Sequence, residues 1–462
     1  MTEHDQPSAA VRRQRDACNA RHIDCRRWSP MRRTALACLA LGALSLQAAA
    51  AELSPVELQI IAAVKARAPD ALKLLERSVE INSGTMNHAG VRAVGQLFRP
   101  ELDQLGFTTS WIEMPAVMRR AGHLLATREG KQGKRLLLIG HLDTVFEADS
   151  PVRKWERKGD RVSGQGVNDM KGGDVVIIEA LRALHRVGAL ADTSISVMLS
   201  GDEENAGDPK EVSRGDLVAL AKRSDIALAF EGTVLDKAGQ ATGTVGRRAS
   251  SSWELEVKGR QGHSQGVFSQ GSGYGAIYEA ARILDGFRQQ VVEPDLTYNP
   301  GLILGGTGVS YDAALARGAA DGKTNVIANT VLVKGDLRYL DYTQRDRARA
   351  TMRAIAGQNL NGTSASITFT DSYPPMAVTA GNLRILDTYS QASADAGLGP
   401  IAALPAGQRG AGDVQFVAPH IDSLDGLGAT GRGAHSPDED LEIASIERAT
   451  IRTAILLYRL TR

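Results

Sequence analysis

Helix-like and strand-like segments alternate along the chain from Glu52 to its end, and this alternation limits the possible fold more than any other feature. Three short apolar runs have the length and character of buried strands: "RLLLIG", "ISVMLSG" and "IALAF". Between the first two lies "GGDVVIIEALRALHRVG", which has the apolar spacing of a helix. Strands that alternate with helices predict an α/β fold in which flanking helices cover a mostly parallel sheet.

The pattern changes near Gly246. Two alternating segments, "SSWELEVKGR" and "TNVIANTVLVKGDLRYL", predict half-exposed strands, and a helical segment follows each of them. This order predicts an inserted α+β domain of the ferredoxin-like kind. We expect it to span residues 247–370 and to divide a larger domain into two parts, residues 52–246 and 371–462.

Residues 1–51 are expected to form a leader rather than part of the fold. The stretch "MRRTALACLALGALSLQAAAA", residues 31–51, combines two arginines, an apolar core and small residues, as a signal peptide does. We take Met31 as the true start and expect a periplasmic or secreted protein without a membrane span once the signal is removed. The leader also contains all three cysteines, so the exported part would have no thiol ligand: Cys18, Cys25 and Cys38.

Polar residues after the predicted strands mark a local site. The whole chain has a formal net charge of +1 at pH 7, which argues against a nucleic-acid partner bound through a general basic field. The carboxyl ends of parallel strands meet at one edge of a sheet, where ligands bind. A histidine and several carboxylates follow the three strands: His141 with Asp143, Asp202 with Glu203 and Glu204, and Glu231.

Two glycine-rich segments add to this set. Asp169 lies in "GQGVNDMKGG" and His435 lies in "GRGAHSPDED". Each feature alone has an ordinary explanation as a surface turn, a solvated carboxylate pair or a loop histidine. Together they form an imidazole and carboxylate set without thiolate, which suits Zn²⁺ and also Co²⁺ or Mn²⁺.

Six ordered motifs carry a resemblance to a known family. The chain contains "GHLDTV", "GQGVNDMKGG", "SGDEENAGD", "AFEGT", "VKGRQGHSQG" and "GAHSPDE". In this order it resembles the dizinc metallopeptidase family of glutamate carboxypeptidase, aminoacylase, dipeptidases and succinyl-diaminopimelate desuccinylase. The resemblance implies a catalytic domain with two Zn²⁺ per chain, in which Asp169 bridges the ions and the other ligands pair as His141 with Glu231 and Glu204 with His435.

The resemblance also implies roles for four further residues. Glu203 would be the general base, and Asp143 would accept the second imidazole N–H of His141. The inserted domain would be a lid that often dimerises. His263 would complete the site, sometimes across the dimer, and stabilise the oxyanion. Asn325 matches a lid asparagine near the substrate. The strand "SSWELEV" is expected to pair edge to edge in a homodimer.

Recognition of a substrate carboxylate stays open at this point. Close relatives of glutamate carboxypeptidase have an arginine before a proline where the lid returns to the main domain, but this chain has Tyr373 before Pro374. A tyrosine cannot replace a planar cation. Either another arginine binds the substrate carboxylate or the substrate has no carboxylate there. The candidate arginines are Arg247, Arg248, Arg338 and Arg409. Arg338 is equally explained as a strand-edge charge and Arg409 as a solvated loop residue.

Three hypotheses follow. The first is an exported dizinc hydrolase, like glutamate carboxypeptidase, that releases a C-terminal amino acid from a short peptide or an N-acyl amino acid. The second is an N-acyl amino acid amidohydrolase or a dipeptidase, which would differ only in the side chains that grip the substrate ends. The third, from another class, is a non-catalytic binding protein that keeps the fold. The intact ligand set and Glu203 argue against the third.

Overall fold

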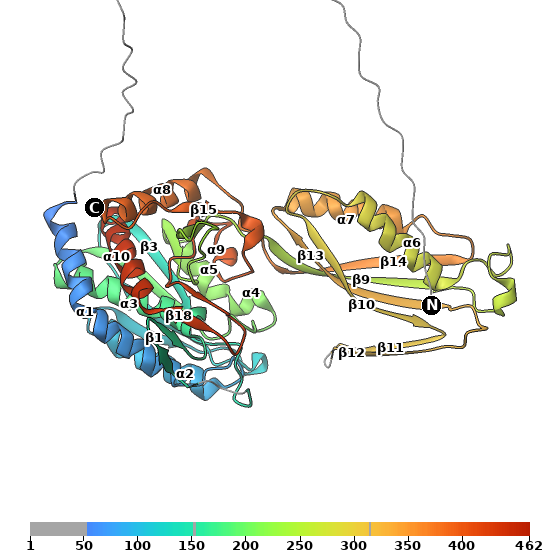
Figure 1. Ribbon diagram of the computed structural model, residues 1–462, viewed down its shortest axis with the longest axis horizontal. Helices are drawn as coiled ribbons and strands as arrows, with labels where there is room; N and C mark the ends of the chain where they lie inside the picture. The colour runs from blue at the N-terminus through green and yellow to red at the C-terminus, as the bar shows by residue number, and fades with distance from the viewer. Residues whose placement is uncertain (1–52, 151–153, 314–315) are drawn as a thin grey trace, which may run out of the picture. The chain divides into compact units, whose positions relative to one another are not determined.

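The computed structural model describes residues 53–150, 154–313 and 316–462 (Figure 1). The predicted leader, with its signal peptide and start at Met31, lies outside the described residues. Among the residues that are described, no helix has the length and apolar character needed to cross a membrane.

A six-stranded sheet carries the strands predicted first. Its order is β1-β2-β6-β3-β7-β16. Neighbouring strands from β6 to β16 are parallel, whereas β1 and β2 run antiparallel to their neighbours. This confirms the mostly parallel sheet of an α/β fold. The strands are β1 Thr108–Ile112, β2 His123–Arg128, β3 Gln132–His141, β6 Thr193–Ser200, β7 Ile226–Ala229 and β16 Asp422–Leu424.

Helices cover both faces of this sheet, which explains the uninterrupted apolar run at residues 136–139 of its central strand, β3. Leu136 and Leu138 of β3 belong to a core shared with the long helices, and Leu137 and Ile139 belong to a second core on the opposite face. Because successive strand residues point to opposite faces, an uninterrupted apolar run fits a strand buried on both sides. The long helices are α1 Pro55–Val79, α2 His88–Asp103, α3 Gly172–Arg186, α8 Ala380–Asp395 and α10 Ile443–Leu460, and the short helices near the second core are α4 Lys210–Ser213, α5 Gly215–Ala221 and α9 Val414–Val417.

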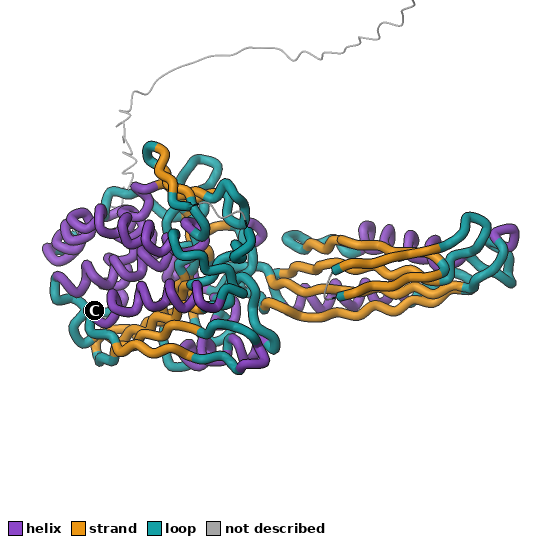
Figure 2. Tube along the Cα trace, turned by 90° about the horizontal axis from the view of Figure 1, so that it is seen from below, coloured by secondary structure: helices purple, strands orange, loops and turns teal. Residues whose placement is uncertain are grey.

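A second, four-stranded antiparallel sheet has the order β10-β13-β9-β14. Two helices lie along one of its faces (Figure 2) and share a separate hydrophobic core with it. This is the strand order of the ferredoxin-like arrangement predicted for the insertion. The boundaries drawn for the domains stay a prediction. The elements are β9 Ala249–Gly259, α6 Gly275–Gln290, β10 Thr297–Gly306, β13 Thr330–Tyr339, α7 Tyr342–Ala356 and β14 Thr363–Tyr373.

One expectation about this second sheet is wrong. The segment "SSWELEV" belongs to β9, which lies between β13 and β14 and is hydrogen-bonded to both. Its alternation reflects one face packed on α6 and the other face exposed, not a free edge. The edge strands of this sheet are β10 and β14.

Smaller sheets complete the fold. The strands β17, β18, β5 and β4 form a sheet that joins the C-terminal loop to the segment before α3. A parallel pair joins β8 to β15, and β11 pairs with β12 in a hairpin after β10. Their bounds are β4 Glu156–Lys158, β5 Arg161–Ser163, β8 Thr242–Thr244, β11 Gly308–Asp312, β12 Arg317–Asp321, β15 Ala402–Leu404, β17 Gly431–Arg432 and β18 Asp440–Glu442.

Candidate metal centre and active site

The three strands that carry the predicted site residues are neighbours, in the order β6-β3-β7. His141 is the last residue of β3. Glu203 and Glu204 follow β6, and Glu231 follows β7. Because the strands are parallel, these side chains reach the same edge of the sheet, as the sequence predicts.

Asp169 reaches this edge from the glycine-rich turn before α3. Gly166 in that turn has φ +69°, and a Cβ added there would lie 2.4 Å from Cγ2 of Thr144. Only glycine allows the loop to take this conformation so close to its neighbour. The turn thus places the Asp169 carboxylate over the end of β3.

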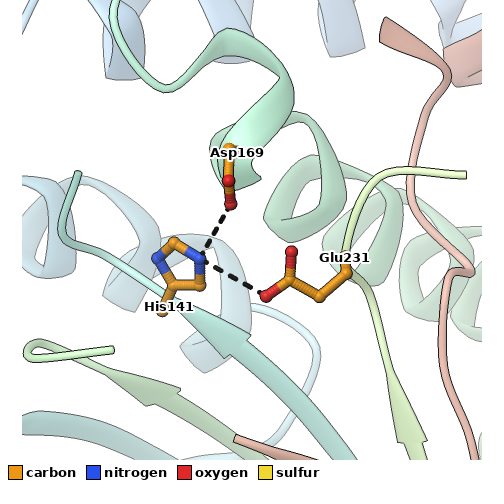
Figure 3. Close-up of side chains that lie close together, drawn as sticks. All are labelled: His141, Asp169 and Glu231. Carbon is orange, nitrogen blue, oxygen red and sulfur yellow. Dashed lines mark hydrogen bonds and ion pairs between the residues drawn. The ribbon is translucent and has the colours of Figure 1, made fainter. Parts of the chain in front are cut away.

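His141, Asp169 and Glu231 form one compact group of potential ligands (Figure 3). Nε2 of His141 lies 3.2 Å from Oδ1 of Asp169 and 3.6 Å from Oε1 of Glu231. The imidazole is buried, with 1% of its side chain exposed. The three side chains converge on one point from three different elements.

Asp169, Glu204 and His435 form a second group. Nε2 of His435 lies 3.2 Å from Oδ2 of Asp169 and 3.1 Å from Oε2 of Glu204. Asp169 therefore directs one carboxylate oxygen to each group, which is the geometry of a residue that bridges two cations. The structure brings together all five residues that the resemblance assigned as ligands.

This donor set fits two divalent cations. Within each group the ligand atoms lie within 4.8 Å of one another, and all are imidazole nitrogens or carboxylate oxygens. Oε1 of Glu204 is buried and accepts no hydrogen bond from the described part of the chain, so it has capacity for a cation. A third set of ligand atoms, from His141, Glu203 and Glu204, also lies within 4.8 Å of one another. Proximity alone would therefore allow Glu203 to be a metal ligand.

The electrostatics of the cluster favour added positive charge. Hydrogen bonds to Asp169 and Glu204 raise the pKa of His435 to about 11. Burial raises the pKa of Glu204 to about 7, and the nearby Asp169 carboxylate adds to this effect. Burial opposes ionisation of Asp169 as well, but hydrogen bonds from His141 and His435 outweigh it and lower the pKa of that carboxyl. His435 and Glu204 thus hold protons that bound metal ions would replace.

Asp143 holds the site together by a contact other than the predicted one. Nδ1 of His141 lies 3.0 Å from the backbone carbonyl oxygen of Asp143 but 3.5 Å from Oδ1 of its carboxylate. The carboxylate instead accepts hydrogen bonds from the backbone N–H groups of Glu203 and Glu204, at 3.0 and 3.1 Å. The hydroxyl of Thr85 donates a third bond at 2.6 Å. Asp143 therefore fixes the imidazole through its backbone and the Glu203–Glu204 segment through its side chain.

Glu439 is a site residue that the sequence reasoning missed. This buried carboxylate accepts hydrogen bonds from the backbone N–H groups of Gly166, Asn168 and Asp169, at 2.9, 2.8 and 2.9 Å. It follows His435 in the same loop, so one loop supplies a ligand and supports the bridging residue. The available signal was the final letter of the motif "GAHSPDE", since a carboxylate beside a glycine-rich loop can accept that loop's amide protons.

A cavity of about 480 Å³ opens beside the cluster. Arg338 and Arg409 both line it, as predicted for substrate-binding residues. Arg338 is 35% exposed and donates to Asp336 at 3.1 Å. Arg409 is only 14% exposed, its guanidinium lies 3.9 Å from the Glu231 carboxylate, and its Nε–H has no partner among the residues that the structure describes.

The other two candidate arginines are already engaged. Arg247 donates to Asp425 at 2.7 Å and to the carbonyl oxygens of Gly410 and Ala411. Arg248 donates to Thr297 and to a backbone carbonyl; its Nε–H is also buried without a partner among the described residues, but Arg248 is not one of the residues that line the cavity. Arg409 is thus the arginine in the cavity wall with a buried donor left free.

His263 and Asn325 do not reach the cluster in this chain. They lie beside each other, because the N–H of Ser264 donates to the Asn325 carbonyl at 2.9 Å and His263 pairs with Val326. Ser250, near the start of β9, lines the cavity, whereas His263 follows the opposite end of that strand. At about 3.3 Å per residue, the length of β9 puts roughly 30 Å between Ser250 and the end near His263.

Tyr373 lies at the end of β14 and lines the cavity. Its hydroxyl donates to the backbone carbonyl oxygen of Glu203 at 3.2 Å. Its ring packs edge-on against Phe416, with the ring centres 5.1 Å apart. The residue that replaces the expected arginine is therefore bound to the segment of the predicted base.

Comparison with known proteins identifies the relatives of this arrangement. Residues 137–458 match the model of the peptidase family M20/M25/M40. The chain is 27% identical over 404 residues to carboxypeptidase G2 of Pseudomonas sp. (strain RS-16), covering 85% of this chain and 89% of that protein. It is 23% identical over 407 residues to a succinyl-diaminopimelate desuccinylase of Variovorax paradoxus, covering 81% and 94%. The structure of a dinuclear metal-binding M20 peptidase of Bacillus subtilis superposes with a TM-score of 0.60 at 15% identity, covering 86% and 99% of the two chains, which shows the shared fold.

Proposed function

The chain belongs to the peptidase family M20/M25/M40 and is a metal-dependent hydrolase, and we propose that it releases a C-terminal amino acid from a short peptide or an N-acyl amino acid. The observation that carries this proposal is the pair of ligand groups joined by Asp169, next to a cavity that contains the free donor of Arg409. The two ligand groups suit amide hydrolysis, and the buried cation suits a substrate with a carboxylate near the cleaved bond.

We assign two Zn²⁺ ions to this centre, and Co²⁺ or Mn²⁺ fit the same donors. His141, Asp169 and Glu231 would hold one ion, and Asp169, Glu204 and His435 the other. The dinuclear centre of the Bacillus subtilis relative supports this number. When bound, the ions would polarise the amide carbonyl and lower the pKa of the attacking water towards about 7.

Glu203 is the proposed general base. Burial raises the pKa of Glu203 well above its usual range; His141 opposes this, and the carboxylates of Glu231 and Asp413 reinforce it. A raised pKa makes the carboxylate a stronger base, and cations bound beside it would favour its ionised form before the reaction. Glu203 would therefore take a proton from the attacking water and deliver it to the nitrogen of the leaving amine.

Arg409 is the proposed receptor for the substrate carboxylate. Burial and the neighbouring Arg247 lower the pKa of Arg409, so the site destabilises this cation. An anionic substrate group would compensate it and would accept a charge-assisted hydrogen bond from the unpartnered Nε–H. Arg338 is more exposed and already paired, so we expect it to contribute less.

A homodimer is the proposed working form. His263 and Asn325 lie too far along β9 to act in the site of their own chain, so their predicted roles require a second copy. The edge strand β10 is a suitable contact, because Ile303 on it is 56% exposed and Ile277 and Tyr278 of α6 are 52% and 54% exposed. Export by the leader remains part of the proposal, and N-terminal sequencing of the protein from the periplasm or medium would test it.

The relatives also support a second substrate class. The desuccinylase relative removes a succinyl group, as its name says, and the same centre would cleave the N-acyl bond of an acyl amino acid. An N-acyl amino acid hydrolase or dipeptidase would keep the metals and Glu203 and differ in which substrate end Arg409 binds. A non-catalytic binding protein would have no use for Glu203 beside the ligand groups.

The test is a substrate screen with the zinc-loaded protein. Dipeptides and N-acyl amino acids with aspartate, glutamate or aromatic C-terminal residues should include a substrate that is cleaved, and a chelator should abolish the cleavage. Glu203→Ala should lose at least about a hundredfold in kcat while it keeps its metal. Full turnover by that variant would disprove the base assignment, and no cleavage by reconstituted wild type would favour the binding protein.

A further inference from the structure

Tyr373 has no hydrogen-bond donor left for a substrate. A phenol has a single O–H donor, and that of Tyr373 goes to the Glu203 carbonyl oxygen at 3.2 Å. To bind a substrate carboxylate, the side chain would have to release this contact. Arg409, in the same cavity, has a donor that is already free.

The Glu203 peptide unit is held from two sides. On one side, its N–H donates to Oδ1 of Asp143 at 3.0 Å. On the other side, its carbonyl accepts from Tyr373. Asp143 comes from the end of β3 and Tyr373 from the end of β14, so the two contacts tie the base to both sheets.

The Tyr373 ring is itself fixed. It packs edge-on against the ring of Phe416. The guanidinium of Arg214 in turn lies over the Phe416 ring, 5.6 Å from its centre. Arg214 is 1% exposed and bonds to the carboxylates of Asp202 and Asp413. A hydroxyl on so constrained a ring can fix the position of the carbonyl that it contacts.

We propose that Tyr373 is a positioning residue for Glu203, and that the carboxylate recognition expected at this position has passed to Arg409. This inference rests on the proposed role of Glu203 as the base. The Tyr373 hydroxyl restricts the Glu203 backbone, so that the carboxylate points to the attacking water. Loss of the hydroxyl lowers the rate of the chemical step and leaves substrate binding intact.

Tyr373→Phe removes the hydroxyl alone and tests this role. We expect kcat to fall about 3- to 10-fold, with KM within about twofold of wild type. The matched control is Tyr298→Phe, since the hydroxyl of Tyr298 also donates to a backbone carbonyl, that of Phe287, at 2.6 Å. The control should keep both kcat and KM. Metal content and thermal unfolding of each variant verify that it folds, and Tyr373→Trp offers a second way to displace the hydroxyl, with the same expected loss.

Two comparisons separate positioning from substrate contact. With a substrate whose terminal carboxylate is an amide, Arg409→Gln should lose its effect on KM, whereas Tyr373→Phe should still lower kcat. In a Glu203→Gln background, Tyr373→Phe should change the residual kcat by less than about twofold, because the group that it positions is gone.

Three results would overturn the inference. They are a rise in KM with unchanged kcat in Tyr373→Phe, no change in either constant, or an undiminished loss of kcat in the Glu203→Gln background. Full turnover by Glu203→Gln itself would show instead that the proposed base is wrong, and the inference about Tyr373 would fall with it.

Discussion

Two regions of the molecule hold residues that we expect to act on a substrate. The first is the edge of the six-stranded sheet at β6, β3 and β7, and the second is the end of the four-stranded sheet beyond β9. At the first, three strand ends and two loops bring five potential ligands together around Asp169. At the second, His263 and Asn325 lie beside each other but line no part of the cavity next to the ligands.

The difference shows which part of the chemistry one chain can complete alone. Parallel strands place their carboxyl ends at a common edge, so the ligand cluster is a direct consequence of the chain's own topology. The strand β9 instead separates Ser250 at the cavity from His263 at its opposite end. We therefore expect metal binding to be a property of each chain and full catalysis to be a property of the proposed dimer.

Asp169→Asn should have the largest effect on metal binding and activity. The substitution keeps the size of the side chain but removes the charge that both ligand groups share, so we expect both ions to be lost and activity to fall below about one thousandth of wild type. His435→Ala removes a ligand from only one group and should retain one ion. Metal analysis of the two purified variants checks this, and equal metal content in both would contradict a bridging role.

His263→Ala should affect the second region without affecting metal content. We expect kcat to fall about 10²- to 10³-fold if the imidazole stabilises the oxyanion. Mixing this variant with Glu203→Gln should then restore up to about a quarter of wild-type activity, because a mixed dimer has one site with both residues intact. A mixture no more active than its parts would contradict action across the dimer.

Arg409→Gln should weaken substrate binding more than Arg338→Gln does. Loss of a buried charge-assisted hydrogen bond should raise KM about 10- to 100-fold, whereas loss of the exposed, paired Arg338 should raise it less than about threefold. Steady-state kinetics with one substrate on both variants compare them directly. The reverse order would move carboxylate recognition to the second sheet.

Zinc affinity should depend on pH in a defined direction. Asp169 and Glu204 raise the pKa of His435 to about 11, so the metal-free imidazole is protonated at neutral pH and a metal ion must displace that proton. Affinity should therefore rise about tenfold for each pH unit above about pH 7, and more steeply below it, where Glu204 also holds a proton that the metal must displace. Calorimetric titration in buffers of different ionisation enthalpy would count the released protons, and a pH-independent affinity would exclude this competition.

The sequence predicted the first region well because its signals are local. The apolar runs ending at His141, before Glu203 and before Glu231 define three strands, and a parallel sheet then places their ends together. The contacts of Asp143 and Glu439 could not be predicted in the same way, because both depend on backbone N–H groups whose directions no residue pattern encodes. The interior position of β9 could not be predicted either. A strand with one exposed face has the same alternation of apolar and polar residues at the edge of a sheet and in its middle.

A zinc titration of the metal-free protein would show whether Asp169 bridges two metal ions. The ions bound per chain should be counted by atomic emission after removal of excess zinc, with hydrolysis measured at each step. We expect two ions per chain in the wild type and loss of both in Asp169→Asn. A wild type that saturates at one ion, or an Asp169→Asn variant that binds zinc as the wild type does, would contradict it.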